Sequence, residues 1–175
     1  MIDKRKNKFQ IKKNKIMEDK KTFVVFTDGG CDAISKIGAS AILIIDPDID
    51  GIIYEWSDAF KNTTNNRMEL IAFKEALENL PNDCEVIFMT DSQYCITVLS
   101  GNKSEYPKNM DLIRNIRAIR SEKNISCDYH HVKAHNGNKW NEMVDSACER
   151  AIQQMKNEIS PGKDNKGSLI SKYGY

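Results

Sequence analysis

Residues 84–92 read CEVIFMTDS, an almost unbroken apolar run that ends at Asp91. So short a run, rich in β-branched and aromatic side chains, predicts a strand at the centre of a sheet with both of its faces covered. Asp91 would then stand at the carboxyl end of this strand. A short helix from Ser92 to Leu99 is expected to follow.

The segments on either side supply the rest of a mixed sheet. Upstream, three β-rich runs separated by turn residues predict antiparallel strands, and a run of helical period follows them. The predicted strands are Thr22–Thr27, Gly38–Ile45, Gly51–Phe60, Cys84–Thr90 and Ile125–Val132, with a turn at Asp28-Gly29-Gly30 after the first. The first predicted helix is capped by Asn65 and Asn66 and ends before Pro81. The other predicted helices are Ser92–Leu99, Asp111–Arg120 and Trp140–Ile159, the last of which follows a polar loop at Lys133–Lys139. We therefore predict an α/β (α+β) fold with a five-stranded mixed sheet, in which three antiparallel strands precede parallel ones and helices cover both faces.

Length and composition exclude several classes of protein. The chain has 175 residues, of which 40% are hydrophobic and 29% are charged, as in globular rather than disordered or fibrous proteins. Its apolar runs fall far short of the roughly 20 residues that span a bilayer, so no membrane association is expected. Five cysteines without a C-x-x-C pair indicate neither a disulfide framework nor a zinc site. We expect a cytoplasmic monomer.

Positive charge is concentrated at the N-terminus. Residues 1–21 carry nine Lys or Arg and three acids, a local charge of +6, whereas the rest of the chain carries 17 basic and 22 acidic residues, or −5. We predict a flexible basic tail at 1–20, one folded domain at 21–159 and a loose tail at 160–175. The favoured interpretation of the basic tail is a solvated low-complexity extension. The alternative is a polycation that binds nucleic-acid phosphates.

Four acidic residues stand where this fold would bring them together. Asp28 and Asp91 follow strands at the edge where open α/β sheets bind ligands. Glu69 is expected in the first turn of its helix, and Asp145 beside the apolar stripe of the last helix. Taken singly, Asp28 fits a turn former and Asp91 fits an N-cap. Glu69 fits a helix-dipole contact and Asp145 fits ordinary boundary solvation, so only convergence on one cleft indicates function.

Carboxylates that share one cleft need positive charge between them. Without it they repel one another and their pKa values rise, and Arg67 is the one nearby basic residue in sequence that could supply it. Two Mg²⁺ ions, or Mn²⁺, meet this need because carboxylate oxygens are hard ligands. Two such ions about 3.5–4 Å apart promote in-line displacement at phosphorus. Phosphodiester hydrolysis is therefore the first functional hypothesis.

Five sequence blocks occur here in the order found in type 1 ribonuclease H. They are Asp28-Gly29-Gly30-Cys31, Thr63 to Leu70 (TTNNRMEL), Thr90 to Tyr94 (TDSQY), Val132 to His135 (VKAH) and Asn141-Glu142-x-x-Asp145. The chain resembles that family over residues 21–159. The resemblance implies a ribonuclease H-like catalytic domain, an endonuclease that hydrolyses the RNA strand of RNA–DNA hybrids with two metal ions and leaves 5′-phosphate and 3′-hydroxyl ends.

The resemblance also implies roles for particular residues. The four acids resemble the family's metal-binding carboxylates, with Asp28 as the bridge between two ions. His135 resembles its mobile histidine, which assists proton transfer or product release. The implied substrate contacts are Cys31, Thr64 (a DNA-strand phosphate), Asn65, Asn66 and Gln93 (the minor groove of the hybrid) and Asn141. His130 and His131, inside a predicted strand, are expected to be structural.

The sequence departs from the family pattern in two places. Asp32 to Ile37 (DAISKI) replaces a Gly-Asn-Pro-Gly stretch, and the segment between Tyr94 and Asp111 lacks the long basic helix and loop of many bacterial members. The missing phosphate contacts predict weaker hybrid binding. We hypothesise that the basic tail binds phosphates in place of the missing segment. Two rival functions stay open: a DNA-cleaving or strand-transfer enzyme of the same fold, and a nucleic-acid-binding module without catalysis.

Overall fold

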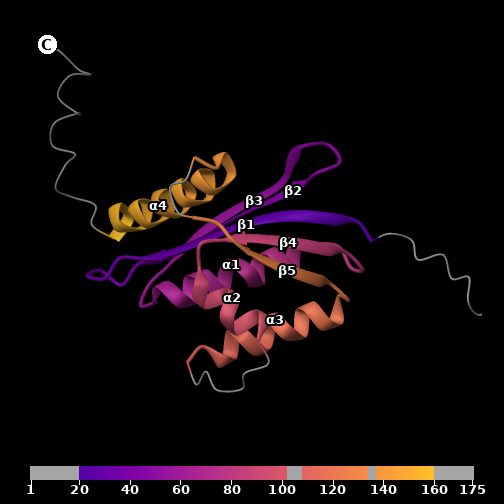
Figure 1. The fold of residues 1–175 in the computed structure, drawn as a ribbon. Helices are drawn as coiled ribbons and strands as arrows, with labels where there is room; N and C mark the ends of the chain where they lie inside the picture. The colour runs from indigo at the N-terminus through magenta and orange to yellow at the C-terminus, as the bar shows by residue number, and fades with distance from the viewer. Residues whose placement is uncertain (1–19, 102–107, 134–136, 160–175) are drawn as a thin grey trace, which may run out of the picture.

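A five-stranded mixed sheet forms the centre of the chain (Figure 1). The computed structural model describes residues 20–101, 108–133 and 137–159, so residues 1–19 of the predicted N-terminal tail, the predicted C-terminal tail and His135 lie outside the described residues. The strands are β1 (Thr22–Cys31), β2 (Gly38–Asp46), β3 (Gly51–Phe60), β4 (Glu85–Thr90) and β5 (Ser126–His131), in the order β3-β2-β1-β4-β5. The first three are antiparallel, and β4 and β5 run parallel to β1, which confirms the predicted sheet.

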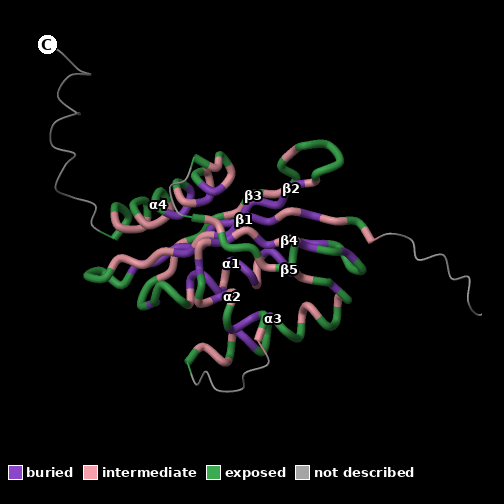
Figure 2. The backbone as a smooth tube through the Cα atoms, viewed as in Figure 1, coloured by how far each residue is buried: buried purple, intermediate pink, exposed green. Residues whose placement is uncertain are grey.

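Helices cover both faces of this sheet, and each face has its own core. Helices α1 (Asn65–Asn79), α2 (Gln93–Ser100) and α3 (Met110–Glu122) pack on one face, and α4 (Lys139–Ile159) packs on the other (Figure 1). Phe73 and Phe88 contact each other in the larger core, with ring centroids 4.6 Å apart. Figure 2 shows the burial concentrated where strands and helices meet. None of the described helices has the length and hydropathy of a membrane span.

The prediction that β4 is covered on both faces holds only in part. Val86, Phe88 and Thr90 are buried, whereas Ile87 and Met89 on the other face are only half-buried. The reason is the placement of α4, which packs on β1, β2 and β3. A continuous apolar run therefore marks a strand here, but not one that is enclosed on both sides.

The predicted end of the first strand is wrong. The strand continues through Asp28-Gly29-Gly30 to Cys31, because these residues pair with Gly38 to Ala41 of β2. The turn follows at Asp32, whose carboxylate accepts hydrogen bonds from the backbone N–H and the hydroxyl of Ser35, both at 2.7 Å. Asp28 is therefore a residue within a strand and not a turn former.

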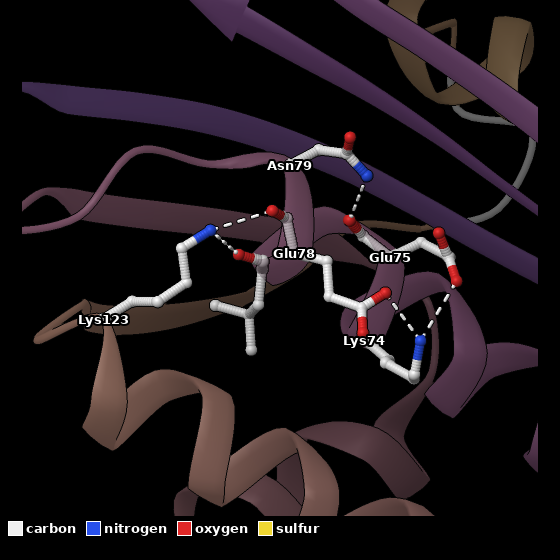
Figure 3. Close-up of polar contacts among 6 residues, drawn as sticks. Lys74, Glu75, Glu78, Asn79 and Lys123 are labelled. Carbon is white, nitrogen blue, oxygen red and sulfur yellow. Dashed lines mark hydrogen bonds and ion pairs between the residues drawn. The ribbon is translucent and has the colours of Figure 1, made fainter.

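Lys123 joins the end of α3 to the end of α1 (Figure 3). Its ammonium group donates to the carbonyl oxygens of Leu77 at 2.9 Å, Glu78 at 2.8 Å and Leu80. The last carbonyl groups of a helix have no partner inside the helix, so a cation that binds three oxygens in this region acts as a C-terminal cap. This contact fixes α1, which carries Glu69, against α3.

Replacing Lys123 with Met should lower the free energy of unfolding by about 1.5–3 kcal/mol, the range for hydrogen bonds that involve a charged group. Urea denaturation measures the loss. Lys74→Met is the matched control, because Lys74 makes only partly exposed ion pairs with Glu75 and Glu78 (Figure 3). The control should lose less than about 1 kcal/mol. Equal losses in the two variants would show that the carbonyl contacts of Lys123 contribute no more than a surface ion pair.

Candidate metal centre

Three carboxylates from three separate elements meet at one end of the sheet. Asp28 lies on β1, Glu69 on α1 and Asp91 directly after β4, and each offers an oxygen within 4.8 Å of the others. The parallel register explains why Asp28 and Asp91 are neighbours. Thr27 of β1 is opposite Thr90 of β4, and the two acids are the residues that follow this pair. Such convergence at the carboxyl ends of parallel strands is where α/β folds bind ligands.

Glu69 reaches the site because α1 touches the sheet at a glycine. A Cβ on Gly29 would lie 2.2 Å from the backbone nitrogen of Glu69 and 2.5 Å from the carbonyl carbon of Met68. The Ser40 hydroxyl of β2 also donates to the carbonyl oxygen of Met68 at 2.7 Å. Only a residue without a side chain permits this approach, so Gly29 sets the distance between the helix and the strand that carries Asp28.

The start of α1 differs from the prediction. The N-cap is Thr64, which makes no side-chain capping bond, and Asn65 and Asn66 are the first helical residues rather than caps. Glu69 is consequently the fifth residue of the helix, past its first turn, and only 4% exposed. A helix-dipole contact does not explain a carboxylate at that depth, because the dipole acts within the first turn.

Asp91 does not cap α2 either. The N-cap is Ser92, whose hydroxyl accepts from the backbone N–H of Cys95 at 3.3 Å. The hydroxyl of Thr90 in turn accepts from the N–H of Ser92 at 3.1 Å. These bonds hold the turn on both sides of Asp91, so its carboxylate is not needed for the local backbone.

The electrostatics of the site call for a cation. Burial, together with the charges of Asp28 and Asp91, raises the pKa of Glu69 to about 9. Burial, together with the charges of Asp91 and Asp145, likewise raises the pKa of Asp28 to about 6. Oε2 of Glu69 is buried and has no hydrogen-bond partner among the described residues. The orphaned oxygen and the all-carboxylate donor set fit hard divalent ions such as Mg²⁺ or Mn²⁺.

Arg67 does not neutralise this charge. Its guanidinium forms two parallel bonds with Asp111 of α3, at 3.1 and 2.8 Å, and a longer one with the side chain of Asn109 at 3.4 Å. This pairing fastens the first turn of α1 to α3. The positive charge that the carboxylates require must therefore come from another source.

Asp145 lies outside the set of three carboxylates but acts on it. It is a half-buried residue of α4, and its charge is one of the causes, after burial and Asp91, of the raised pKa of Asp28. It comes from the opposite face of the sheet to α1 (Figure 1). The two helices thus carry acids toward the same end of β1.

The residues expected to contact substrate lie on several elements and differ in exposure. Thr64, Asn65 and Asn66 are exposed at the start of α1, and Gln93 is exposed at the start of α2. Cys31 is half-buried, with its thiol 3.4 Å from the carbonyl oxygen of Thr63, and Asn141 is only 7% exposed. His130 and His131 are exposed at the end of β5. The structure therefore offers polar side chains to solvent at two helix N-termini, one beside Glu69 and one beside Asp91.

Three further residues shape the site and were not singled out from the sequence for that role. Gly29 and Ser40 set the approach of α1, and the Cys148 thiol of α4 donates to the carbonyl oxygen of Ala39 on β2 at 3.2 Å. The sequence signal for Gly29 was the Gly pair after Asp28, which also fits a turn. Ser40 and Cys148 have no signal of their own, because their partners lie 28 and 109 positions away in the chain.

Comparisons with known proteins agree with this geometry. A family model described as RNase H matches residues 20–153. The ribonuclease H of Francisella philomiragia is 30% identical over 153 residues, which cover 80% of this chain and 97% of that protein. The ribonuclease H of Wolbachia pipientis wMel is 35% identical over 145 residues, which cover 76% of this chain and 97% of that protein.

Solved structures support the same fold. LC11-RNase H1, isolated from compost, superposes with a TM-score of 0.65 at 24% identity and covers 78% of this chain and 99% of its own. The N-terminal RNase H domain of a Mycobacterium tuberculosis protein gives a TM-score of 0.65 at 17% identity, over 79% of this chain and 98% of that one. At such identities the structures bear on the fold alone, whereas the family model and the curated relatives span most of the sequence. The chain therefore belongs to the RNase H family of hydrolases.

Proposed function

We propose that the chain cleaves the RNA strand of RNA–DNA hybrids at a centre that holds two Mg²⁺ ions. The convergence of Asp28, Glu69 and Asp91, with a buried carboxylate oxygen that lacks a hydrogen-bond partner among the described residues, is the observation that carries the proposal. Asp145 is the fourth ligand that we assign, from α4. When bound, the ions would activate the attacking water and stabilise the leaving 3′-oxygen.

The residues of the chain then have separate tasks. We assign Asp28 the ligand role between two ions, since the charges of both Asp91 and Asp145 act on its carboxylate. Burial of Glu69 and partial burial of Asp28 limit the access of competing water to these ligands. We assign proton transfer or product release to His135, which lies outside the described residues.

Substrate recognition is assigned to the polar side chains around the carboxylates. An RNA–DNA hybrid presents 2′-hydroxyl groups in a wide minor groove, and neutral amides can both donate to them and accept from them. Asn65, Asn66 and Gln93 are exposed amides on the segments that carry two of the acids, and we assign the exposed Thr64 to a DNA-strand phosphate. Cys31 and Asn141 are assigned to the same surface. The curated relatives named ribonuclease H support this substrate class.

Incubation of the full chain with an end-labelled RNA–DNA hybrid tests the proposal. In Mg²⁺ or Mn²⁺ we expect internal cuts in the RNA strand that leave 5′-phosphate and 3′-hydroxyl ends, and none in chelator. An all-DNA duplex of the same sequence should stay intact, and its cleavage would favour a DNA-cleaving member of the fold. A cyclic phosphate product would implicate the 2′-hydroxyl as nucleophile. Binding of the hybrid without cleavage in either metal would favour a non-catalytic module.

A further inference from the structure

A cavity that opens to solvent lies between α4 and the turn that follows β1. Its volume is about 570 Å³, and polar and charged side chains form most of its lining, among them Cys31, Asp32, Glu149, Arg150, Gln153 and Lys156. Ile152 also lines it, and the Cδ1 atom of this residue is 3.6 Å from the position that a Cβ on Gly30 would occupy. The α4 wall of the cavity is therefore packed directly on β1.

Asp32 fixes the other wall, which is the turn. Its carboxylate accepts hydrogen bonds from the backbone N–H groups of Ser35 at 2.7 Å and Ile34 at 3.2 Å. The same carboxylate forms an ion pair with Lys156 of α4 at 2.9 Å, which joins the turn to the helix. The charges of Asp32 and Lys156 balance each other, so this pair holds the cavity in shape without giving it a net charge.

Arg150 brings an unpaired positive charge to the cavity. Its guanidinium has no hydrogen-bond or ion-pair partner in the part of the chain that the structure describes, and the residue is exposed. Gln153, three residues later, is its neighbour on the helix surface. The Gln153 amide donates one hydrogen bond to Asn157 at 3.2 Å, which leaves its second N–H available. A guanidinium with an amide donor beside it suits a phosphate group, whose oxygens accept bidentate bonds from arginine.

The cavity is close to the carboxylates along both of its walls. Cys31 follows Asp28 by three residues of β1, a distance of about 10 Å in an extended strand. Arg150 follows Asp145 by five residues of α4, a rise of about 7.5 Å along the helix axis. A nucleic-acid strand with one phosphate at the carboxylates would bring another phosphate to the cavity within a few nucleotides.

The two faces of the sheet separate the two strands of a hybrid. Asn65, Asn66 and Gln93, which we assign to the minor groove, lie at the starts of α1 and α2, whereas α4 covers the opposite face (Figure 1). The DNA strand lies across this wide groove from the RNA strand. It is therefore expected on the side of α1 and α2, and the side of α4 is left to the strand that is cut.

We infer that Arg150, with Gln153 beside it, binds a phosphodiester group of the RNA strand a few nucleotides from the cut, at the mouth of the cavity between α4 and the turn. The inference rests on the proposed function and adds to it a phosphate contact on α4. Lys156 serves this contact indirectly, because its ion pair with Asp32 keeps the turn in place.

Arg150→Gln in the full chain tests the contact, since it removes the charge from an exposed side chain and leaves the turn intact. The KM for a hybrid in Mg²⁺ should rise by about three- to tenfold, between the effects of an exposed ion pair and of a charged hydrogen bond. The slope of log KM against log salt concentration should fall by about 0.9, the value for one phosphate contact. Lys156→Gln would be less informative, because it would also release the turn.

Arg114→Gln is the matched control for a lost positive charge. Arg114 is likewise an exposed arginine on a helix, but α3 packs on the other face of the sheet. This variant should keep the KM within about twofold of the wild type. Glu149→Gln should act in the opposite direction and lower the KM by about twofold, because Glu149 lines the same cavity and its charge repels a phosphate.

Hybrids with a single uncharged methylphosphonate linkage identify the strand. At one position in the RNA strand, the substitution should raise the KM of the wild type but leave that of Arg150→Gln unchanged, since the two changes remove the same contact. If this non-additive position lies in the DNA strand, if no such position exists, or if Arg114→Gln loses as much as Arg150→Gln, the inference is wrong and the proposed function stands. A wild type that does not cleave the unmodified hybrid overturns both.

Discussion

Asp91→Asn is expected to lower the rate of hybrid cleavage in saturating Mg²⁺ by at least about a thousandfold, because several kcal/mol of transition-state stabilisation come from bound ions and each 1.4 kcal/mol is worth a factor of ten. The substitution keeps the shape of the side chain and removes its charge. The backbone bonds of Thr90 and Ser92 hold the turn without the carboxylate, so the fold should be unaffected. Single-turnover cleavage of a labelled hybrid measures the loss.

The stability of the same variant should move in the opposite direction. The charge of Asp91 contributes to the raised pKa values of both Asp28 and Glu69, so its removal relieves repulsion in the metal-free protein. Thermal unfolding in chelator should occur about 2–4 °C higher, the shift that 1 kcal/mol produces in a domain of this size. Inactivity with a lowered melting temperature would mean misfolding instead of a lost ligand.

Asp128→Asn is the control for charge alone. Asp128 is an exposed acid on β5, the strand next to β4, and it lies outside the carboxylate cluster. Its replacement should leave the cleavage rate within about twofold of the wild type, as for most surface substitutions away from a site. Retained activity in Asp91→Asn, at any metal concentration, would contradict the assignment of Asp91 as a ligand.

Much of the sheet could be predicted because its elements have strong local periods. The apolar runs at Thr22–Thr27 and Cys84–Thr90 and the helical stripe of Trp140–Ile159 were placed within a few residues of β1, β4 and α4. The end of β1 could not be found this way, since Asp28-Gly29-Gly30 has turn composition and is extended only because β2 pairs with it. Burial of β4 was overestimated because the placement of α4 is a tertiary property that no single run of residues encodes.

The candidate site was predictable to a similar degree. The strand-end position of Asp91 follows from the topology of α/β sheets, and the structure brings it beside Asp28 and Glu69 as expected. The ordinary explanations offered for these acids do not hold: Ser92 caps α2, and Glu69 lies past the first turn of α1. The contacts that Gly29 and Cys148 make could not be predicted, because each depends on how closely a helix approaches the sheet.

Gly29→Ala is expected to have the largest effect on the fold and on the site together. The new Cβ would lie 2.2, 2.5 and 2.7 Å from the nitrogen of Glu69, the carbonyl carbon of Met68 and the Cα of Glu69, all of them backbone atoms. No side-chain rotation can relieve such contacts, so α1 must move away from β1 and the Ser40 bond to Met68 must lengthen. The free energy of unfolding should fall by about 2–4 kcal/mol, at or above the usual cost of overpacking.

The displacement should also separate Glu69 from Asp28 and Asp91, and a shift of about 1 Å can cost about a hundredfold in rate. Gly30→Ala is the matched control, because its Cβ would meet only the Cys148 sulfur at 3.5 Å and Ile152 at 3.6 Å, both ordinary contacts. Urea unfolding and single-turnover cleavage of the two variants give the comparison. The free energy of unfolding of Gly30→Ala should stay within about 1 kcal/mol of the wild-type value, in the range of a tolerated substitution. If Gly29→Ala were equally mild, α1 would not be held against β1 at this glycine, and another contact would have to fix the position of Glu69.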